Sequence, residues 1–459
     1  MEPDCVVDVS DTKWSELRKL WQAAFPICMV QVGLMAMGAV DTAIVGRVSK
    51  EALGSIALGS WYKLFWVTLG QGCLMSLDGL VSKAVGACDA DGVGSSLLKG
   101  LLLAFIYSVP LTPLLLLCAP ALRLLGQPAI LIPLASRYCA VQTLAILPTL
   151  LFVVLRQTCQ SLGEVRPLLL CVVVANVCNV FLDVALVWGM PMFGIPAIGP
   201  MGSAWATLCC TWVLLAMLLA TGRRTITPYL MRPKVRHSLR VRPLARLALL
   251  GVPVGLHQMT EFAAFALMIV LIGQLGVVAV AAHNIAMSVS GITWNVSLGI
   301  SSAAAVRTGR AVGRRDPAAV RRASGVSIVS GGVLMGAVGL IMALFPARIA
   351  ALWTSDPSVL AQVTLLLPVA GAFQVFDSTQ TIAAGVLRGL LDTNGLLPAS
   401  LVGYWVIGTP FSILLSRTFG LGAAGVWWGM VAGLGAASAL LQMRVLRRMR
   451  CAEQICRPS

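Results

Sequence analysis

Acidic residues are scarce in this chain. Asp and Glu account for 18 of 459 residues, and all charged residues together make up 11% of the sequence. Soluble domains carry about 25% charged residues, so the composition excludes an ordinary soluble protein. Because 58% of the residues are hydrophobic and the mean hydropathy is +0.88, we predict an integral membrane protein.

Metal and redox motifs are also lacking. The chain has three histidines, and its 13 cysteines form no CxxC pair and no Cys/His run with metal-ligand spacing. Most cysteines lie in apolar stretches, where a free thiol behaves as a small hydrophobe, and we interpret them as packing residues. An integral membrane enzyme would need a His/Asp cluster or a metal motif. We therefore expect no enzyme, no cofactor, and no metal beyond Na⁺ at the intramembrane acids described below.

Long apolar runs are abundant. Stretches of about 20 residues, the length that crosses a hydrocarbon core about 30 Å thick, recur along the whole chain. No apolar core of a cleavable signal peptide occurs in the first 15 residues. We predict twelve spanning helices, over residues 20–45, 53–75, 97–118, 132–155, 167–189, 200–221, 247–273, 278–305, 324–345, 360–385, 397–416 and 421–443.

The net charge of +16 fits either nucleic-acid binding or the enrichment of Lys and Arg in cytoplasmic loops. With twelve spans and a cytoplasmic N-terminus, 27 of the 34 basic residues fall inside, six fall outside, and Lys63 lies within the second span. This asymmetry excludes nucleic acid as a partner. It predicts a multi-pass membrane protein with both termini in the cytoplasm.

The two halves of the chain resemble each other at a nearly fixed offset. Each half holds six spans, so both enter the membrane with the same polarity, as in a parallel repeat. Matching pairs at an offset of 227 are Pro26 and Pro253, Gln31 and Gln258, Gly46 and Gly273, Lys83-Ala84-Val85-Gly86 and Arg310-Ala311-Val312-Gly313, and Asp89 and Asp316.

We therefore predict an all-α integral membrane fold of two six-helix lobes related by a pseudo-two-fold axis. A duplicated unit of this kind is typical of an alternating-access carrier, although a channel or a scaffold is an alternative. The predicted parts are a cytoplasmic tail 1–19, an N-lobe 20–221, a basic cytoplasmic linker 222–246, a C-lobe 247–443 and a basic tail 444–459.

Four of the few acids lie inside predicted spans: Asp41, Asp183, Glu261 and Asp377. A charge at the bilayer centre costs at least ~2.5–3.5 kcal/mol on insertion scales. A membrane protein that retains several such charges is expected to use them. We interpret the four acids as part of a cation or proton pathway.

The N-lobe acids have polar neighbours at the same depth. Asn179 and Asp183 are four residues apart, so they project from one helix face. Depths counted at about 1.5 Å per residue place Asp41 and Thr207 at a similar level. These four residues are expected to converge on one oxygen-rich or protonatable site. The alternatives are an interfacial Asp41 paired with Arg47, or separate polar groups satisfied between helices.

The C-lobe acids are Glu261 and Asp377. His257 precedes Glu261 by four residues on the same helix face, so the pair forms either a proton relay or an ordinary hydrogen-bonded histidine. Pro26 and Pro253 each remove a backbone hydrogen bond and are expected to bend their helices.

The acids do not follow the repeat. At the offset of 227, Asp41 faces Met268 and Glu261 faces Leu34. Acids with a shared scaffold role would tend to occupy matching positions, so the mismatch favours specialised sites. Asp78, near the cytoplasmic end of the second span, is expected to form an ion pair there.

Several segments resemble the multidrug and toxic compound extrusion (MATE) family, in its bacterial NorM-like branch. They are Asp41-Thr42-x-x-Val45-Gly46, Asn179-x-x-x-Asp183, Ala281-Ala282-His283-Asn284-Ile285, Val306-Arg307-Thr308-Gly309-Arg310-Ala311-Val312-Gly313 and Phe373-Gln374-x-x-Asp377-x-x-Gln380-x-x-x-x-Gly385-x-Leu387-Arg388-Gly389. The resemblance extends from about Leu20 to Met443. It implies coupling sites at Asp41, Asn179, Asp183 and Thr207 in the N-lobe and at Glu261 and Asp377 in the C-lobe.

The resemblance also implies efflux of cationic or amphipathic organic compounds, driven by entry of Na⁺ or H⁺. His257 and Asn284, a position that is often Gln in the family, depart from the family pattern. We expect a monomer whose partners are a small organic substrate and membrane lipid. The alternative function is a flippase or exporter of a lipid-linked or natural-product substrate with related two-lobe architecture.

Overall fold

The computed structural model describes residues 12–190, 194, 196–232 and 241–456. Parts of the predicted N-terminal tail (1–11), linker (233–240) and C-terminal tail (457–459) therefore lie outside the described residues. Within the described part, twelve helical stretches are long and apolar enough to cross a membrane, as predicted. They are Lys13–Val45, Lys50–Gly86, Ala90–Leu116, Ile132–Leu162, Arg166–Trp188, Met201–Thr221, Arg242–Gly273, Val277–Gly313, Pro317–Leu344, Pro357–Gly389, Leu396–Thr418 and Gly422–Arg450.

The chain divides into two compact units. The N unit comprises Met29–Leu77 and Asp89–Gly255, and the C unit comprises the residues up to Cys28, Asp78–Cys88 and the residues from Leu256 onward. These units are defined by packing, whereas the predicted lobes are defined by the sequence repeat. The two divisions differ because the first parts of two long helices, and one short helix, pack outside their own half of the repeat.

The N unit is a bundle of packed helices. Its main members are α2 (Lys50–Met75), α4 (Ala90–Leu116), α6 (Ile132–Leu162), α7 (Arg166–Trp188) and α8 (Met201–Thr221), with the short α5 (Cys118–Leu124) and α9 (Arg223–Leu230) at their ends. Gly59 allows α2 to approach α6, because a Cβ atom there would lie 2.9 Å from the ring of Tyr138. Tyr138 is itself buried in the apolar core of this unit.

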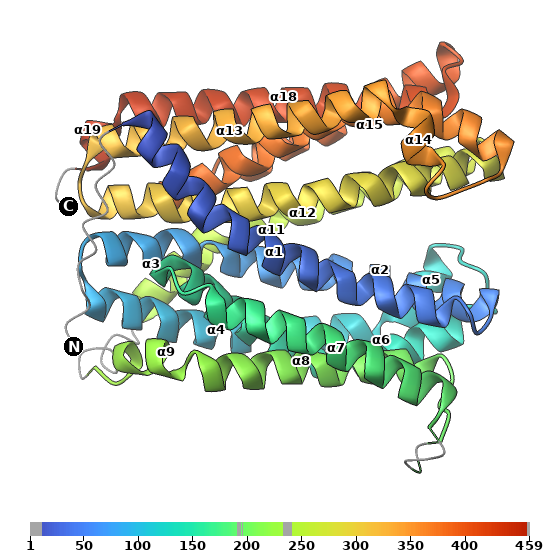
Figure 1. The fold of residues 1–459 in the computed structure, drawn as a ribbon, viewed down its shortest axis with the longest axis horizontal. Helices are drawn as coiled ribbons and strands as arrows, with labels where there is room; N and C mark the ends of the chain where they lie inside the picture. Colours follow the sequence, from blue (N-terminus) through green and yellow to red (C-terminus); the bar gives the residue numbers. More distant parts are fainter. Residues whose placement is uncertain (1–11, 191–193, 195, 233–240, 457–459) are drawn as a thin grey trace. The chain divides into compact units, whose positions relative to one another are not determined.

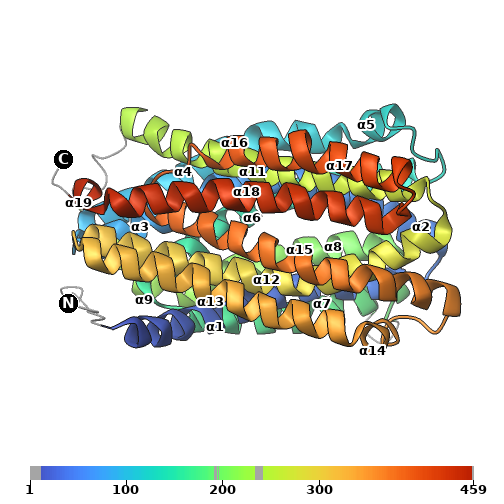
Figure 2. The same ribbon diagram turned by 90° about the horizontal axis from the view of Figure 1, so that it is seen from above.

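The C unit places four long helices side by side (Figures 1 and 2). They are α12 (Val277–Gly313), α13 (Pro317–Leu344), α15 (Pro357–Gly389) and α18 (Gly422–Arg450). The short helices α14 (Pro346–Ala350) and α19 (Ala452–Ile455) lie at the ends of these long helices. A buried core that includes Met268, Phe373 and Trp427 holds them together.

The eleventh span is an irregular helix. It begins as α16 (Leu396–Ser400) and continues as a π-helical segment, Leu401–Gly408. The α-helix α17 (Thr409–Ile413) follows, and the span ends in a second π-helical segment, Leu414–Thr418. Gly403 packs directly on α18, where an added Cβ atom would lie 2.6 Å from the Cβ of Ala437 and 2.7 Å from the carbonyl oxygen of Gly433. π-helical segments are rare and are frequent at functional sites, and the first of these two contains the buried residue Tyr404.

Two long helices each contribute to both units. The first part of α1 (Lys13–Val45) belongs to the C unit because Cys28 fits against Gly299 of α12, where a Cβ would clash at 2.5 Å. The first part of α11 (Val241–Gly273) belongs to the N unit because Gly255 fits against Cys73 of α2. Residues 28 and 255 are 227 positions apart. In each half of the repeat, the first helix therefore begins in the unit that is formed mainly by the other half.

The repeat also relates two glycine contacts between helix ends in the C unit. Gly86, at the end of α3 (Leu77–Gly86), packs on the backbone of Arg310, and Gly313 packs on the backbone of Lys83. Each contact is the repeat image of the other. An added Cβ would meet a carbonyl oxygen at 2.2 Å in the first case and 2.1 Å in the second, so only glycine fits at these positions.

The turns that follow these helix ends match as well. Cys88 and Arg315 have φ angles of 54° and 57°, which is a left-handed conformation. Asp89 then caps α4 by accepting a hydrogen bond from Gly92 N, and Asp316 caps α13 in the same way. The repeated Asp of the sequence is therefore a helix-capping residue.

Candidate functional site

A polar cluster of the N unit forms around Asp41. The Asn179 amide of α7 donates a 2.8 Å hydrogen bond to Asp41 Oδ1, and the Thr207 hydroxyl of α8 lies 2.8 Å from Asp41 Oδ2. Two consecutive helices, α7 and α8, thus meet the distant helix α1 at one carboxylate. The structure brings these side chains together as the helix spacing predicts, whereas their role in coupling stays a prediction.

Asp183 completes this cluster from the next turn of α7. Asn179 and Asp183 are both fully buried, and Asp183 faces Asp41 and Ser203. Neither Asp183 carboxylate oxygen accepts a hydrogen bond from the described residues, and the same holds for Asn179 Oδ1 as an acceptor. An ionised carboxylate buried without donors is very costly, so this oxygen set suits a bound proton or a small monovalent cation.

Thr207 has one hydroxyl proton and two acceptors. Its Oγ1 lies 2.9 Å from the carbonyl oxygen of Ser203 and 2.8 Å from Asp41 Oδ2. The carbonyl can only accept. If Thr207 donates to Ser203, then a protonated Asp41 can donate to Thr207; if Asp41 is ionised, Thr207 donates to Asp41. The geometry therefore accommodates Asp41 in both protonation states.

The polar cluster of the C unit is built on Glu261 of α11. The Tyr404 hydroxyl donates a 2.9 Å hydrogen bond to Glu261 Oε1, and Gln380 Nε2 of α15 donates at 2.9 Å to the Tyr404 oxygen. His257 Nε2 lies 4.0 Å from Glu261 Oε2, one helical turn away. The structure thus brings His257 and Glu261 together, while a relay role for His257 stays a prediction.

Asp377 lies beside this chain of hydrogen bonds. It is 1% exposed, its Oδ1 has no hydrogen-bond partner among the described residues, and its charged neighbour is Glu261. Gln374 and Gln380 flank it one turn away in each direction on α15, and their amide oxygens are likewise buried without a donor from the described part of the chain. The C unit therefore holds a second set of buried oxygen atoms around two carboxyl groups.

The sequence did not identify Tyr404. It lies in an apolar run, and its role follows from the π-helical segment Leu401–Gly408, where Thr409 Oγ1 donates to the Tyr404 carbonyl oxygen. Packing of Gly403 on α18 fixes that segment. Gln380 was visible as part of the motif around Asp377, and its polar side chain inside a span was the available signal.

Other sequence-predicted residues have structural partners. Asp78 is fully buried and pairs with Arg388 of α15 at 3.2 Å, which confirms the expected ion pair. Pro26 and Pro253 lie inside α1 and α11, as expected, and bends at these positions stay predictions. A second buried pair of the C unit, Glu16 with Arg307, was not predicted; its two hydrogen bonds are 2.8 and 2.7 Å long.

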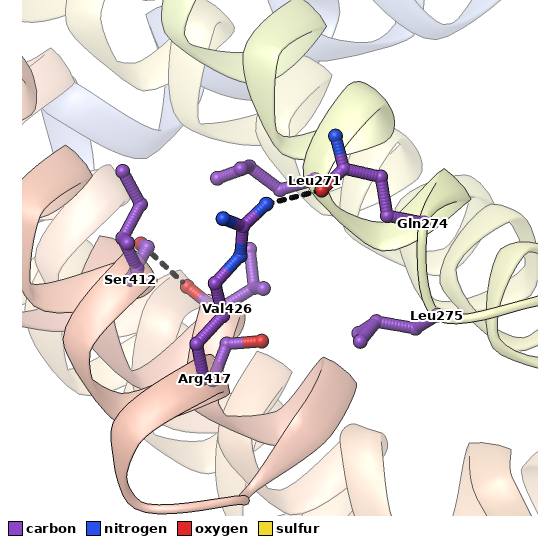
Figure 3. A pocket seen from close by; sticks show the side chains of 8 residues that line it. Leu271, Gln274, Leu275, Ser412, Arg417 and Val426 are labelled. Atoms are coloured by element: carbon purple, nitrogen blue, oxygen red, sulfur yellow. Dashed lines mark hydrogen bonds between the residues drawn. The ribbon is translucent and has the colours of Figure 1, made fainter.

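A separate pocket of about 170 Å³ opens between α11, α18 and the end of the eleventh span (Figure 3). Arg417 reaches across it and donates to Gln274 Oε1, while Ser412 Oγ donates at 2.9 Å to the carbonyl of Val426. The pocket lining contains no carboxylate among the described residues. It is therefore distinct from the Glu261–Asp377 cluster.

The two halves of the chain match one family model. The MatE model matches residues 26–185 and again residues 253–414. The chain belongs to the MatE family. The two matched segments begin 227 positions apart, which is the offset of the internal repeat. As a member of the MatE family, the chain is a membrane transporter and not an enzyme.

Named relatives agree with this assignment. The chain is 34% identical over 433 residues to "Probable multidrug resistance protein NorM" of Burkholderia pseudomallei, covering 93% of this chain and 91% of that one. It is 29% identical over 448 residues to "Multidrug resistance protein MdtK" of Proteus mirabilis, covering 96% and 97%. The resemblance to the MATE family is thus confirmed.

Solved MatE-family structures share the fold. The crystal structure of the eukaryotic MATE transporter AtDTX14 superposes with a TM-score of 0.86 at 21% identity, covering 97% of this chain and 100% of that one. An outward-facing MATE transporter gives a TM-score of 0.84 at 19% identity, covering 96% and 97%. These matches confirm an all-helical fold with twelve candidate spans.

Proposed function

We propose that this chain is a secondary active multidrug efflux transporter that exports cationic or amphipathic organic compounds by antiport with Na⁺ or H⁺. The observation that carries the proposal is the cluster of Asp41 and Asp183, in which a fully buried carboxyl group faces a partly buried one and accepts no hydrogen bond from the described residues. The names of the relatives, multidrug resistance proteins NorM and MdtK, support the substrate class.

In the N unit, a coupling cation or an organic cation neutralises the carboxylates, but both cannot do so at once. Binding of a proton or Na⁺ at Asp41 and Asp183 removes the negative charge that attracts a cationic substrate. Thr207 supports the exchange because its hydroxyl serves either state of Asp41. The substrate then leaves from the outward-open state.

In the C unit, Glu261 and Asp377 supply a second pair of buried carboxyl groups. Tyr404 and Gln380 hold Glu261 in place through successive 2.9 Å hydrogen bonds. The buried amide oxygens of Gln374 and Gln380 add neutral oxygen ligands for a cation such as Na⁺. We assign this cluster a role in coupling or substrate attraction that complements the N-unit site.

The carrier works by alternating access in the plasma (inner) membrane. Loading of the coupling cation permits reorientation toward the cytoplasm, where the cation is released and substrate binds. The excess of Lys and Arg on one predicted side supports a cytoplasmic location of both termini. The transporter acts as a monomer surrounded by lipid.

The test is efflux of a fluorescent organic cation from vesicles under an imposed Na⁺ or proton gradient. Asp41→Asn, Glu261→Gln and Asp377→Asn are expected to lower gradient-driven transport by about tenfold or more each, which corresponds to about 1.4 kcal/mol. Asp89→Asn is the matched control, because Asn caps a helix as well as Asp. Full activity in all three variants would disprove the coupling assignment, and transport that ignores both gradients would disprove antiport.

A further inference from the structure

Lys63 is a positive charge in the middle of a spanning helix, and the mechanism above does not use it. It follows Lys50, the first residue of α2, by 13 positions, or about 20 Å of helix. An ionisable residue within a span usually faces the interior of the bundle and marks a substrate or ion pathway. Lys63 therefore requires an account of its own.

Lys63 lies on the inward face of α2. Gly59 and Val67, one turn before and after it, are both buried, and Gly59 packs against Tyr138 of α6. Trp61 and Leu64 carry the exposed apolar surface of the same helix. Lys63 itself is partly buried, and its ammonium group lies against Tyr138 and Gln142 of α6.

The contacts of Lys63 are neutral. Its Nζ lies 3.3 Å from the Tyr138 hydroxyl, 3.4 Å from Gln142 Oε1, and 5.5 Å from the centre of the Tyr138 ring. Among the described residues, no carboxylate forms an ion pair with it. An ammonium group has three N–H donors, so one donor remains available, and no carboxylate among the described residues neutralises the charge.

The partner Gln142 connects this site to the Asp41 cluster. Gln142 Nε2 donates a 2.9 Å hydrogen bond to the carbonyl of Ala204 on α8, which turns its amide oxygen toward Lys63. Thr207, the partner of Asp41, follows Ala204 by three residues on the same helix, or about 4.5 Å. Lys63 and Asp41 thus lie at nearly the same level of one unit and carry opposite charges.

We propose that Lys63 recognises a carboxylate on the transported compound, so that the N unit accepts zwitterionic amphiphiles through Lys63 and Asp41 together. This proposal rests on the efflux function proposed above. The ammonium group and the Tyr138 hydroxyl offer two adjacent donors for one carboxylate.

The experiment uses two dyes that differ in one group: tetramethylrhodamine, which has a free carboxylate, and its methyl ester, which lacks it. Uptake into inside-out vesicles is measured under imposed Na⁺ and proton gradients. Lys63→Met is expected to lower the ratio of acid to ester transport about tenfold or more, and Lys63→Arg is expected to keep the ratio within about threefold. Lys99→Met, which removes another partly buried lysine of the N unit, is expected to retain the wild-type ratio.

An unchanged ratio in Lys63→Met would overturn the proposal, whether both dyes are still transported or both decline together. If transport of both dyes declines together, Lys63 acts by holding the side chains of Tyr138 and Gln142 in place. Lys63→Gln repeats the measurement if the Met variant does not accumulate. If the wild type transports neither dye under either gradient, the proposed efflux function fails for organic cations of this class, and binding replaces transport as the measurement. Fluorescence anisotropy of the two dyes with purified protein then decides whether Lys63→Met selectively weakens binding of the acid.

Discussion

Asn179 and Asp41, 138 positions apart in the sequence, are joined by a 2.8 Å hydrogen bond between α7 and α1. The bond holds Asp41 Oδ1 while the amide oxygen of Asn179 accepts no hydrogen bond from the described residues. A buried amide therefore supports the carboxylate and adds an oxygen to the same site. Substitutions of the N-unit acids can therefore be compared with substitutions of the residues that hold those acids in place.

Asp183→Asn separates a coupling role from a structural one. The wild-type carboxylate accepts no hydrogen bond from the described residues, so an amide of the same shape breaks none of their bonds and avoids burial of a charge. We expect an unchanged or higher melting temperature and a loss of gradient-driven efflux of about tenfold or more. A clear drop in melting temperature with retained efflux would instead make Asp183 a structural residue.

Tyr404→Phe removes the hydroxyl that links Gln380 to Glu261. A hydrogen bond to a charged group contributes about 1.5–3 kcal/mol, so we expect efflux to fall about tenfold or more and the melting temperature to fall by a few degrees. Tyr62→Phe is the matched control, because its hydroxyl donates at 2.7 Å to the Leu114 carbonyl oxygen rather than to an acid of either site. Equal loss of efflux in both variants would contradict a specific role for Tyr404.

The reciprocal glycine contacts predict a stability difference. Gly86→Ala and Gly313→Ala each place a Cβ about 2 Å from a carbonyl oxygen, and such overpacking typically costs about 1–3 kcal/mol. Gly325→Ala in α13 is the control: nothing lies within 4 Å of its Cβ position, and alanine favours a helix by about 1 kcal/mol over glycine. Thermal unfolding of purified protein measures all three, and a destabilised Gly325→Ala would contradict the argument.

The buried pair of Asp78 and Arg388 should be costly to break. Their side chains are 0% and 3% exposed, and removal of one partner from such a pair costs about 3–5 kcal/mol. Asp78→Asn is therefore expected to lower the melting temperature strongly. Asp316→Asn removes a partly exposed partner that lies 3.9 Å from Arg322, where the expected cost is about 0–1 kcal/mol, and Asn still caps α13. Equal effects in the two variants would contradict this distinction.

Asp392 predicts a pH dependence of stability. Burial raises the pKa of this carboxyl, but hydrogen bonds of 2.9 Å from Arg444 and 2.6 Å from Arg448 outweigh burial and hold the pKa below its usual range. A lowered pKa adds stability above the unfolded value of about 3.9, and this stability is lost as the pH falls through the folded value. Asp392→Asn is expected to melt earlier than wild type at neutral pH, and the difference should shrink below about pH 4. A pH-independent difference would contradict the charge argument.

The number of spanning helices could be predicted from the sequence because apolar length alone decides it. Asp41, Asn179, Asp183 and Thr207 could be assigned to one site because spacing along a helix sets both face and depth. Tyr404 could not be found in this way. It lies in a π-helical segment beside Gly403, which packs closely on α18, and regular helical spacing does not predict such a segment.

The sequence alone determined that this is a duplicated membrane protein with a few carboxylates inside its spans. The signals were the scarcity of acids, the long apolar runs and the repeat at an offset of 227. The hydrophobicity and the length of a spanning helix depend only on the residues of that helix, so both can be predicted from the sequence. Only the tertiary structure decided that the first parts of α1 and α11 pack outside their own halves, that Tyr404 holds Glu261, and that Lys63 has no carboxylate partner among the described residues. Those relationships depend on close backbone approach and on contacts between residues far apart in the chain.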